Sequence, residues 1–330
     1  MLAVNAVDVA AQLATGFDTV EQHVFDDLAP VIDLNGNLPF AGNQLSTQYG
    51  LQAALEDAFV VGASAVDLSS VTSMSQLAAA LSPYGFQLQP GALSDGGLGS
   101  LTGGEVIALV DREFTLSFVG GANEGLAVPL DNTLLSELEY FDHTNFGGAL
   151  DSDTTITVTL TMGVRAVDAD SVEFFVEVGD VLTADIRLTS SLDAGDNTIN
   201  TSELPQGEAW ATLSLDIESL SAQLTGGTNG ALTATDLGQN LSLTTSLPSQ
   251  SSAAAEVFFL IDLSTGQPVD PFEAPVPIHS DWRWIVSSDG AELDPLNSPG
   301  FDESQLRPAL NARIGPGEIA ASPHSPIEQW

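Results

Sequence analysis

The chain has 330 residues, of which 45 are acidic and six are arginine; it has no lysine and no cysteine, and its formal net charge is −39. A basic surface for phosphate is therefore missing, which argues against a nucleic-acid partner and against attraction to anionic lipid headgroups. The absence of cysteine excludes disulfides and thiolate metal sites. Hydrophobic residues make up 43% of the chain, which is enough to form a core and excludes disorder along most of its length.

Residues 1–85 have the apolar period of amphipathic helices. Pro30 and the following "DLNGNLPF" are expected to end the first helix, and Ser73 with Gln76 can form a capping box before the third. In the first apolar stripe, residues recur at three- and four-residue steps: Val7, Ala10, Ala14, Phe17, Val20, Val24 and Leu28. A second stripe has Leu45, Leu51, Leu55 and Phe59, and a third, shorter one has Met74, Leu77, Ala78 and Leu81.

After a glycine-rich passage at 89–104, the period changes to two, and it stays so over 105–263. "TTITVTLTM" and "AWATLSLDIESL" alternate apolar and polar residues, which predicts strands with one buried and one solvent-facing side, typical of antiparallel sheets. Residues 264–330 hold ten of the 17 prolines, and a strand is expected only around Trp282–Val286. The tryptophans at 282 and 284 share one face, and we expect them to plug the sheet rather than to form a sugar-stacking platform.

These patterns predict an α+β fold in which N-terminal amphipathic helices precede a large antiparallel sheet, either curved or folded into a β-sandwich. The expected domains are a helical segment at 1–85, an antiparallel β domain at 105–263 packed on those helices, and a Pro-rich C-terminal extension at 264–330. No apolar run approaches the length of a membrane span, so we expect no membrane insertion.

The stretch "DAGDNTINTSE" partly matches the calcium-binding loop of EF-hands. With Ile199 at position 8, three oxygen donors fall at suitable positions: Asp196 at 5, Asn200 at 9 and Glu203 at 12. The first half does not match, because Asp193 is one place late. A non-standard calcium site and an acidic turn between two strands therefore both remain open for this stretch.

A second oxygen-rich stretch, "FDHTNFGGALDSDT", contains Asp142, Asp151 and Asp153. Calcium takes six to eight oxygen ligands, and loops between strands can supply them. The alternative is a polar connection with no ion. These three aspartates are candidate calcium ligands, together with Asp193, Asp196, Asn200 and Glu203.

Motifs for catalysis are incomplete. The chain has no G-x-S-x-G elbow, P-loop or G-x-G-x-x-G loop. "SLDIESL" resembles the E-x-D-x-E signature of laminarinase-like jelly-roll glycosidases through Asp216 and Glu218, but Ser214 replaces the acid that the resemblance would make the nucleophile. The alternation also places Leu215 and Ile217 on the core face, which leaves both acids on the solvent face for ordinary reasons. We therefore expect that the chain is not an enzyme, and predict no catalytic residue.

The segment "ATGFDTVEQHVFDDLAPVIDLNGNLPFAGNQLSTQYGLQAALEDAF" has a helix, an "LPFAGNQL" corner and a second helix. It resembles helical segments of very large secreted or surface proteins of planctomycete-like bacteria, in which a similar corner precedes acidic, threonine-rich strands. The motifs of this resemblance cover residues 10–60, and a similar acidic, threonine-rich composition continues to about residue 260. It implies a modular, exported and calcium-rich protein, and it transfers no catalytic residue.

The function expected from these features is a non-catalytic, calcium-stabilised module of a bacterial secreted or cell-surface protein, with an adhesive or scaffolding role. Its location would be extracellular or at the cell surface, although this chain shows no secretory signal at its N-terminus. Expected partners are a glycan, a lipid or neighbouring modules of the same protein. Two alternatives remain open: a module that binds an apolar ligand under its helices, and a hydrolase of polysaccharide or ester bonds that uses loop carboxylates.

Overall fold

The computed structural model describes residues 5–63, 68–90, 103–120, 127–130, 148–168, 171–192, 207–239, 241–248, 251–261, 276–287 and 290–294, together with 296, 298, 300 and 301. The α-helices are α1 (Ala6–Ile32), α2 (Gln44–Tyr49), α3 (Leu51–Ala63), α4 (Met74–Leu81) and α5 (Ala234–Gln239), and two 3₁₀ turns are η1 (Leu34–Gly36) and η2 (Ser82–Tyr84). The strands are β1 (Phe86–Pro90), β2 (Val106–Gly120), β3 (Val128–Pro129), β4 (Ala149–Ala166), β5 (Val172–Glu177), β6 (Gly179–Leu192), β7 (Gly207–Thr225), β8 (Ala231–Thr233), β9 (Ser242–Ser246), β10 (Ser252–Ile261), β11 (Val276–Ser287), β12 (Gly290–Leu293) and β13 (Gly300–Phe301).

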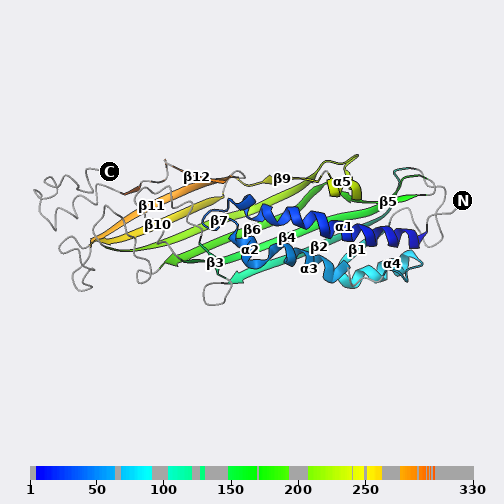
Figure 1. Cartoon of the computed structure of the whole chain (residues 1–330), viewed down its shortest axis with the longest axis horizontal. Helices are drawn as coiled ribbons and strands as arrows, with labels where there is room; N and C mark the ends of the chain where they lie inside the picture. Colours follow the sequence, from blue (N-terminus) through cyan, green and yellow to red (C-terminus); the bar gives the residue numbers. More distant parts are fainter. Residues whose placement is uncertain are drawn as a thin grey trace, which may run out of the picture.

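The strands of the described part form one open, curved, antiparallel sheet (Figure 1). Its main path, β1-β2-β4-β6-β7-β10-β11-β12, follows the order of the chain, so each long strand lies beside its neighbour in sequence. β5 pairs with the last part of β4, and β9 pairs with the last part of β7. The alternating pattern thus gave the correct class of sheet, and of the two expected forms the curved sheet is the one observed.

Helices α1 to α4 lie on one side of the sheet and run along its length (Figure 1). This arrangement explains the alternation, because the residues of β4 at even numbers from Leu150 to Ala166 are buried under the helices, and most of those at odd numbers are not. The buried side chains belong to one hydrophobic core that extends from Ala6 in α1 to Val286 in β11. All three predicted segments contribute to that core.

Helix α1 is held at its start by a capping box between Asn5 and Asp8. The Asn5 side chain accepts hydrogen bonds from the backbone N–H groups of Val7 and Asp8, and the Asp8 carboxylate accepts one from the Asn5 N–H. The predicted apolar stripe is present, but Val7 and Ala14 are exposed, and Val9 and Leu13 are buried instead. Pro30 does not end the helix, which continues to Ile32.

Helix α4 also begins with a cap, although in a form that differs from the expected box. The Ser73 hydroxyl accepts a hydrogen bond from the Gln76 N–H at 3.2 Å, as predicted. The Gln76 side chain, however, accepts from the N–H of Thr72, one residue earlier, at 2.8 Å. The first interaction satisfies one of the backbone donors that a helix start leaves free.

Aromatic rings fill the space between the helices and the first strands. Phe17 of α1 stacks on Phe86 of β1 with ring centroids 4.8 Å apart, and Phe59 of α3 meets both rings edge-on. Arg112 of β2 lies at the margin of this cluster, where its guanidinium donates to the Ala58 carbonyl at 2.6 Å and lies 5.4 Å from the centroid of the Phe86 ring. Burial lowers the pKa of Arg112.

The loop after α1 packs against β11. Phe40 has a positive φ of 63° and is 1% exposed, and its ring meets Trp284 of β11 edge-on at 5.3 Å. Trp282 and Trp284 are both buried, as expected for a plug rather than an exposed platform. Within the described residues, no helix combines the length and the apolar character needed to cross a membrane.

Candidate functional site

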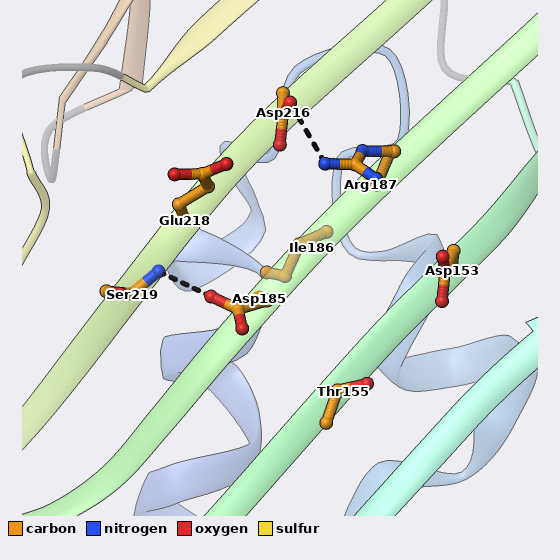
Figure 2. Close-up of a pocket in the computed structure, with 8 residues that line it drawn as sticks. All are labelled: Asp153, Thr155, Asp185, Ile186, Arg187, Asp216, Glu218 and Ser219. Atoms are coloured by element: carbon orange, nitrogen blue, oxygen red, sulfur yellow. Dashed lines mark hydrogen bonds and ion pairs between the residues drawn. The ribbon is translucent and has the colours of Figure 1, made fainter.

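A groove lies on the face of the sheet opposite the helices, across β4, β6 and β7 (Figure 2). Its volume is about 390 Å³. The lining is polar apart from one residue, and it consists of Asp153, Thr155, Asp185, Ile186, Arg187, Asp216, Glu218 and Ser219. We refer to these eight residues as the acidic groove.

The strand register brings these residues together. Asp153 of β4 is paired with Arg187 of β6, and Arg187 is paired in turn with Asp216 of β7. Thr155 is paired with Asp185 in the next solvent-facing row. Because residues two apart on a strand point to the same face, the same alternation that buries the core residues exposes these side chains.

A β-bulge shapes one wall of the groove. Between the pairs Ala184–Leu220 and Ile186–Ile217, β7 has two residues, Glu218 and Ser219, opposite a single Asp185. Ser219 adopts a left-handed backbone conformation with φ of 58°. Its N–H donates to the Asp185 carboxylate at 2.7 Å, which holds the bulge closed (Figure 2). Bulges redirect side chains and increase local twist, and here the bulge places both Glu218 and Ser219 on the groove side.

The groove is strongly negative. Four carboxylates, on Asp153, Asp185, Asp216 and Glu218, surround the single guanidinium of Arg187. Arg187 and Asp216 form an ion pair at 3.4 Å, with side chains 54% and 45% exposed, so water screens this interaction. Such exposed pairs contribute at most about 1 kcal/mol. The groove therefore favours cationic or multiply hydroxylated ligands over anions.

The structure places two of the seven predicted calcium ligands. Asp151 and Asp153 are exposed on the outer face of β4, and Asp153 lines the acidic groove. Asp142, Asp193, Asp196, Asn200 and Glu203 lie outside the described residues. No three Asp, Glu or His side chains come close enough to hold a metal ion within the part of the chain that is described, so the acids of the groove line it without converging on one point.

The strands that flank the predicted stretches lie at the same end of the sheet. β4 begins at Ala149, β6 ends at Leu192, and the register pairs Asp151 with Thr189. β7 begins at Gly207 and pairs with β6 up to Leu192. The two candidate stretches are therefore attached to neighbouring strands, at the end of the sheet nearest Asp153.

Asp216 and Glu218 occupy the positions expected from the alternation, since Leu215 and Ile217, which alternate with them, are fully buried. Sequence reasoning missed Asp185, Arg187 and Ser219 as members of the site. In "ADIRLTSSL" the apolar residues Ile186 and Leu188 alternate with Asp185 and Arg187, a pattern that by itself predicts that Asp185 and Arg187 face solvent. It carried no sign of the bulge, because Ser219 is not a glycine and a bulge depends on the partner strand.

Comparisons with known proteins gave no match: no family model fits the chain, and neither a curated protein nor a solved structure is significantly similar to it.

Proposed function

We propose that this chain is a non-catalytic module of a bacterial secreted or cell-surface protein, that calcium stabilises it, and that it serves an adhesive or scaffolding role. The observation that supports the proposal best is the division of the sheet into two faces. Helices cover one face, and the other is open, polar and acidic around the groove. An open, acid-lined face is suited to contact with cations, glycans or neighbouring modules.

The charge balance supports a role for divalent ions. Six arginines cannot neutralise 45 acidic residues, and the ion pairs among the described residues are Arg165–Glu173 and Arg187–Asp216. Calcium prefers carboxylate oxygens, and the two candidate stretches begin or end on adjacent strands. We therefore place the calcium at Asp142, Asp151, Asp153, Asp193, Asp196, Asn200 and Glu203 rather than in the centre of the groove.

A calcium titration followed by thermal unfolding tests the proposal. An ion that binds only the native state adds RT ln(1 + [L]/Kd), or about 2.7 kcal/mol when the ion is at 100 times Kd. We expect Tm to rise with CaCl₂ relative to chelator, and to rise less in Asp193→Asn/Glu203→Gln. Asp57→Asn on the exposed face of α3 is the charge control and should respond like wild type. An identical Tm in calcium and in chelator would show that calcium does not stabilise the protein.

Hydrolysis is the second candidate, because Asp216 and Glu218 line one groove together with Asp153 and Asp185. Paired carboxylates can act as acid and base on a glycosidic bond. A panel of polysaccharide and ester substrates checks it: turnover that is lost in Asp216→Asn but kept in Asp57→Asn would replace the non-catalytic proposal. The apolar-ligand alternative needs space beneath the helices, where the rings of Phe17, Phe59 and Phe86 are already in contact.

A further inference from the structure

The corner between α1 and α2 contains a buried carboxylate in an unusual position. Asp33 follows the last residue of α1 and is 1% exposed. One of its oxygens accepts a hydrogen bond from the Ser46 N–H, in the first turn of α2, at 2.9 Å. The residue before α2, Asn43, makes no side-chain cap. Asp33 therefore caps α2 across a gap of 13 residues and ties the end of one helix to the start of the next.

The other oxygen of Asp33, Oδ1, is buried and has no hydrogen-bond partner among the described residues. A carboxylate that loses its water and gains few donors is costly to keep ionised. The Ser46 N–H and the Ser46 hydroxyl favour the charged form, but burial outweighs them and raises the pKa of Asp33 to about 6.

The backbone around Asp33 is also strained. Leu34, Asn35 and Phe40 all have positive φ angles, which side chains other than glycine adopt at a cost. The same corner presents Phe40 to Trp284 of β11. The Asp33–Ser46 hydrogen bond thus connects the two ends of a strained segment, residues 33–46. Through Phe40, this segment links the helices to β11.

We propose that the corner is a pH-sensitive latch, which is closed more firmly when Asp33 is protonated and opens more readily when Asp33 is ionised. The sign follows from the direction of the shift. Asp33 has a pKa of about 6 when closed, against 3.8 for the free side chain, so the closed corner binds the proton more tightly than the open one. The extra stability is fully present below about pH 4 and is lost as pH rises through 6.

Among the described residues, few other charged groups lie near the corner. Asp33 is the only Asp, Glu, Arg or His between Asp27 and Gly50. The nearest acids of α1, Asp26 and Asp27, are exposed, and on β11 Arg283 is exposed on the face opposite the tryptophans. On the sheet below α2, the carboxylate of Asp151 acts on Tyr49, whose pKa is raised by burial first and by Asp151 as well.

Hydrogen exchange of the α2 amides tests the latch. The intact chain would be measured in chelator at pH 7 and pH 5, with rates corrected for intrinsic exchange. The protection factor of the Ser46 amide should rise about tenfold from pH 7 to pH 5, as a pKa of about 6 closed and 3.8 open requires. The α4 amides are the internal control, because residues 68–84 carry no Asp, Glu, Arg or His, and their protection should change far less.

Three variants make the result decisive. Asp33→Asn should abolish the tenfold change while Asp27→Asn, which removes a charge from the exposed face of α1, should keep it. Ser46→Ala keeps the backbone donor and removes the hydroxyl that lowers the pKa, so the midpoint of the change should move to higher pH. The latch is overturned if wild-type α2 protection is insensitive to pH, or if Asp33→Asn retains the response. Should Asp33→Asn not fold, an unshifted midpoint in Ser46→Ala overturns it.

Discussion

At the scale of single residues, Ser219 is the position where sequence and backbone conflict. It lies in a strand, yet its φ of 58° belongs to the left-handed region, which costs a non-glycine residue about 1–2 kcal/mol. The strain persists because the Asp185 carboxylate accepts the Ser219 N–H and because the bulge is enclosed by paired strand on both sides. Residues held in such conformations often lie at functional sites, which agrees with its place in the acidic groove.

Substitution by glycine should reveal this strain. Ser219→Gly is expected to leave the free energy of unfolding unchanged or raise it by about 0.5–1 kcal/mol, because glycine adopts a positive φ freely. Ser214→Gly is the matched control on the same strand, where φ is not positive, and should lose about 1 kcal/mol. Urea unfolding of the two variants measures both. Equal losses in the two variants would show that the bulge is not strained in solution.

At the scale of elements, the crossing of α1 over β5 depends on Gly16. A Cβ atom at this position would overlap the ring of Phe174, so the helix can approach the sheet this closely only without a side chain. Glycine inside a helix costs about 1 kcal/mol relative to alanine, and here the close contact offsets that cost. The stripe of large apolar residues in α1 predicted the helix, but nothing in it indicated which residue would touch the sheet.

The change Gly16→Ala should therefore destabilise the protein by about 1–3 kcal/mol, although alanine favours helix, because the ring must move. Phe174→Leu removes the obstacle and should lose stability by itself through the smaller side chain. In the double variant we expect a smaller loss than the sum of the two single losses, since the sites are in contact. Thermal unfolding of all four proteins gives the coupling energy. Strict additivity would contradict the contact.

At the scale of the whole molecule, repulsion between carboxylates opposes folding. Two helices show the effect locally: burial raises the pKa of Glu21 in α1, and the nearby charges of Glu56 in α3 and Asp18 raise it further. The opposite case is Asp236, whose pKa is lowered by hydrogen bonds from the Thr233 backbone and hydroxyl. With a net charge of −39, like-charge repulsion predominates over the chain.

Salt should therefore stabilise the protein. Raising NaCl from about 0.02 M to about 0.5 M shortens the screening length severalfold, so repulsion between exposed acids falls. We expect Tm to increase by several degrees at pH 7.5, and by a smaller amount at pH 4.5, because the net charge is smaller close to the sequence pI of about 4.1. Differential scanning calorimetry in chelator separates this effect from that of calcium. A Tm that falls with salt at pH 7.5 would mean that favourable ion pairs outweigh repulsion.

The sequence by itself determined that the first part of the chain is helical and which face of the long strands is inward. It did not indicate α5, β1, β12 or β13, and it predicted only the Trp282–Val286 part of β11. Hydrophobic period is a local property, so Ile156, Leu215 and Trp284 could be assigned to the core without knowing their neighbours. Net charge and the lack of cysteine are likewise fixed by composition. The apolar stripe also gave α1, although it misplaced Val7 and Ala14 and took Pro30 as the end of the helix.

Only the tertiary structure decided how those faces meet. The acidic groove requires the register of β4, β6 and β7, and the bulge at Ser219 exists only relative to Asp185, 34 residues away in the chain. In the same way, the role of Asp33 depends on Ser46, and that of Phe40 on Trp284 of β11. Contacts between segments that are distant in the chain depend on how the whole sheet and the helices pack. A local sequence pattern therefore cannot predict them.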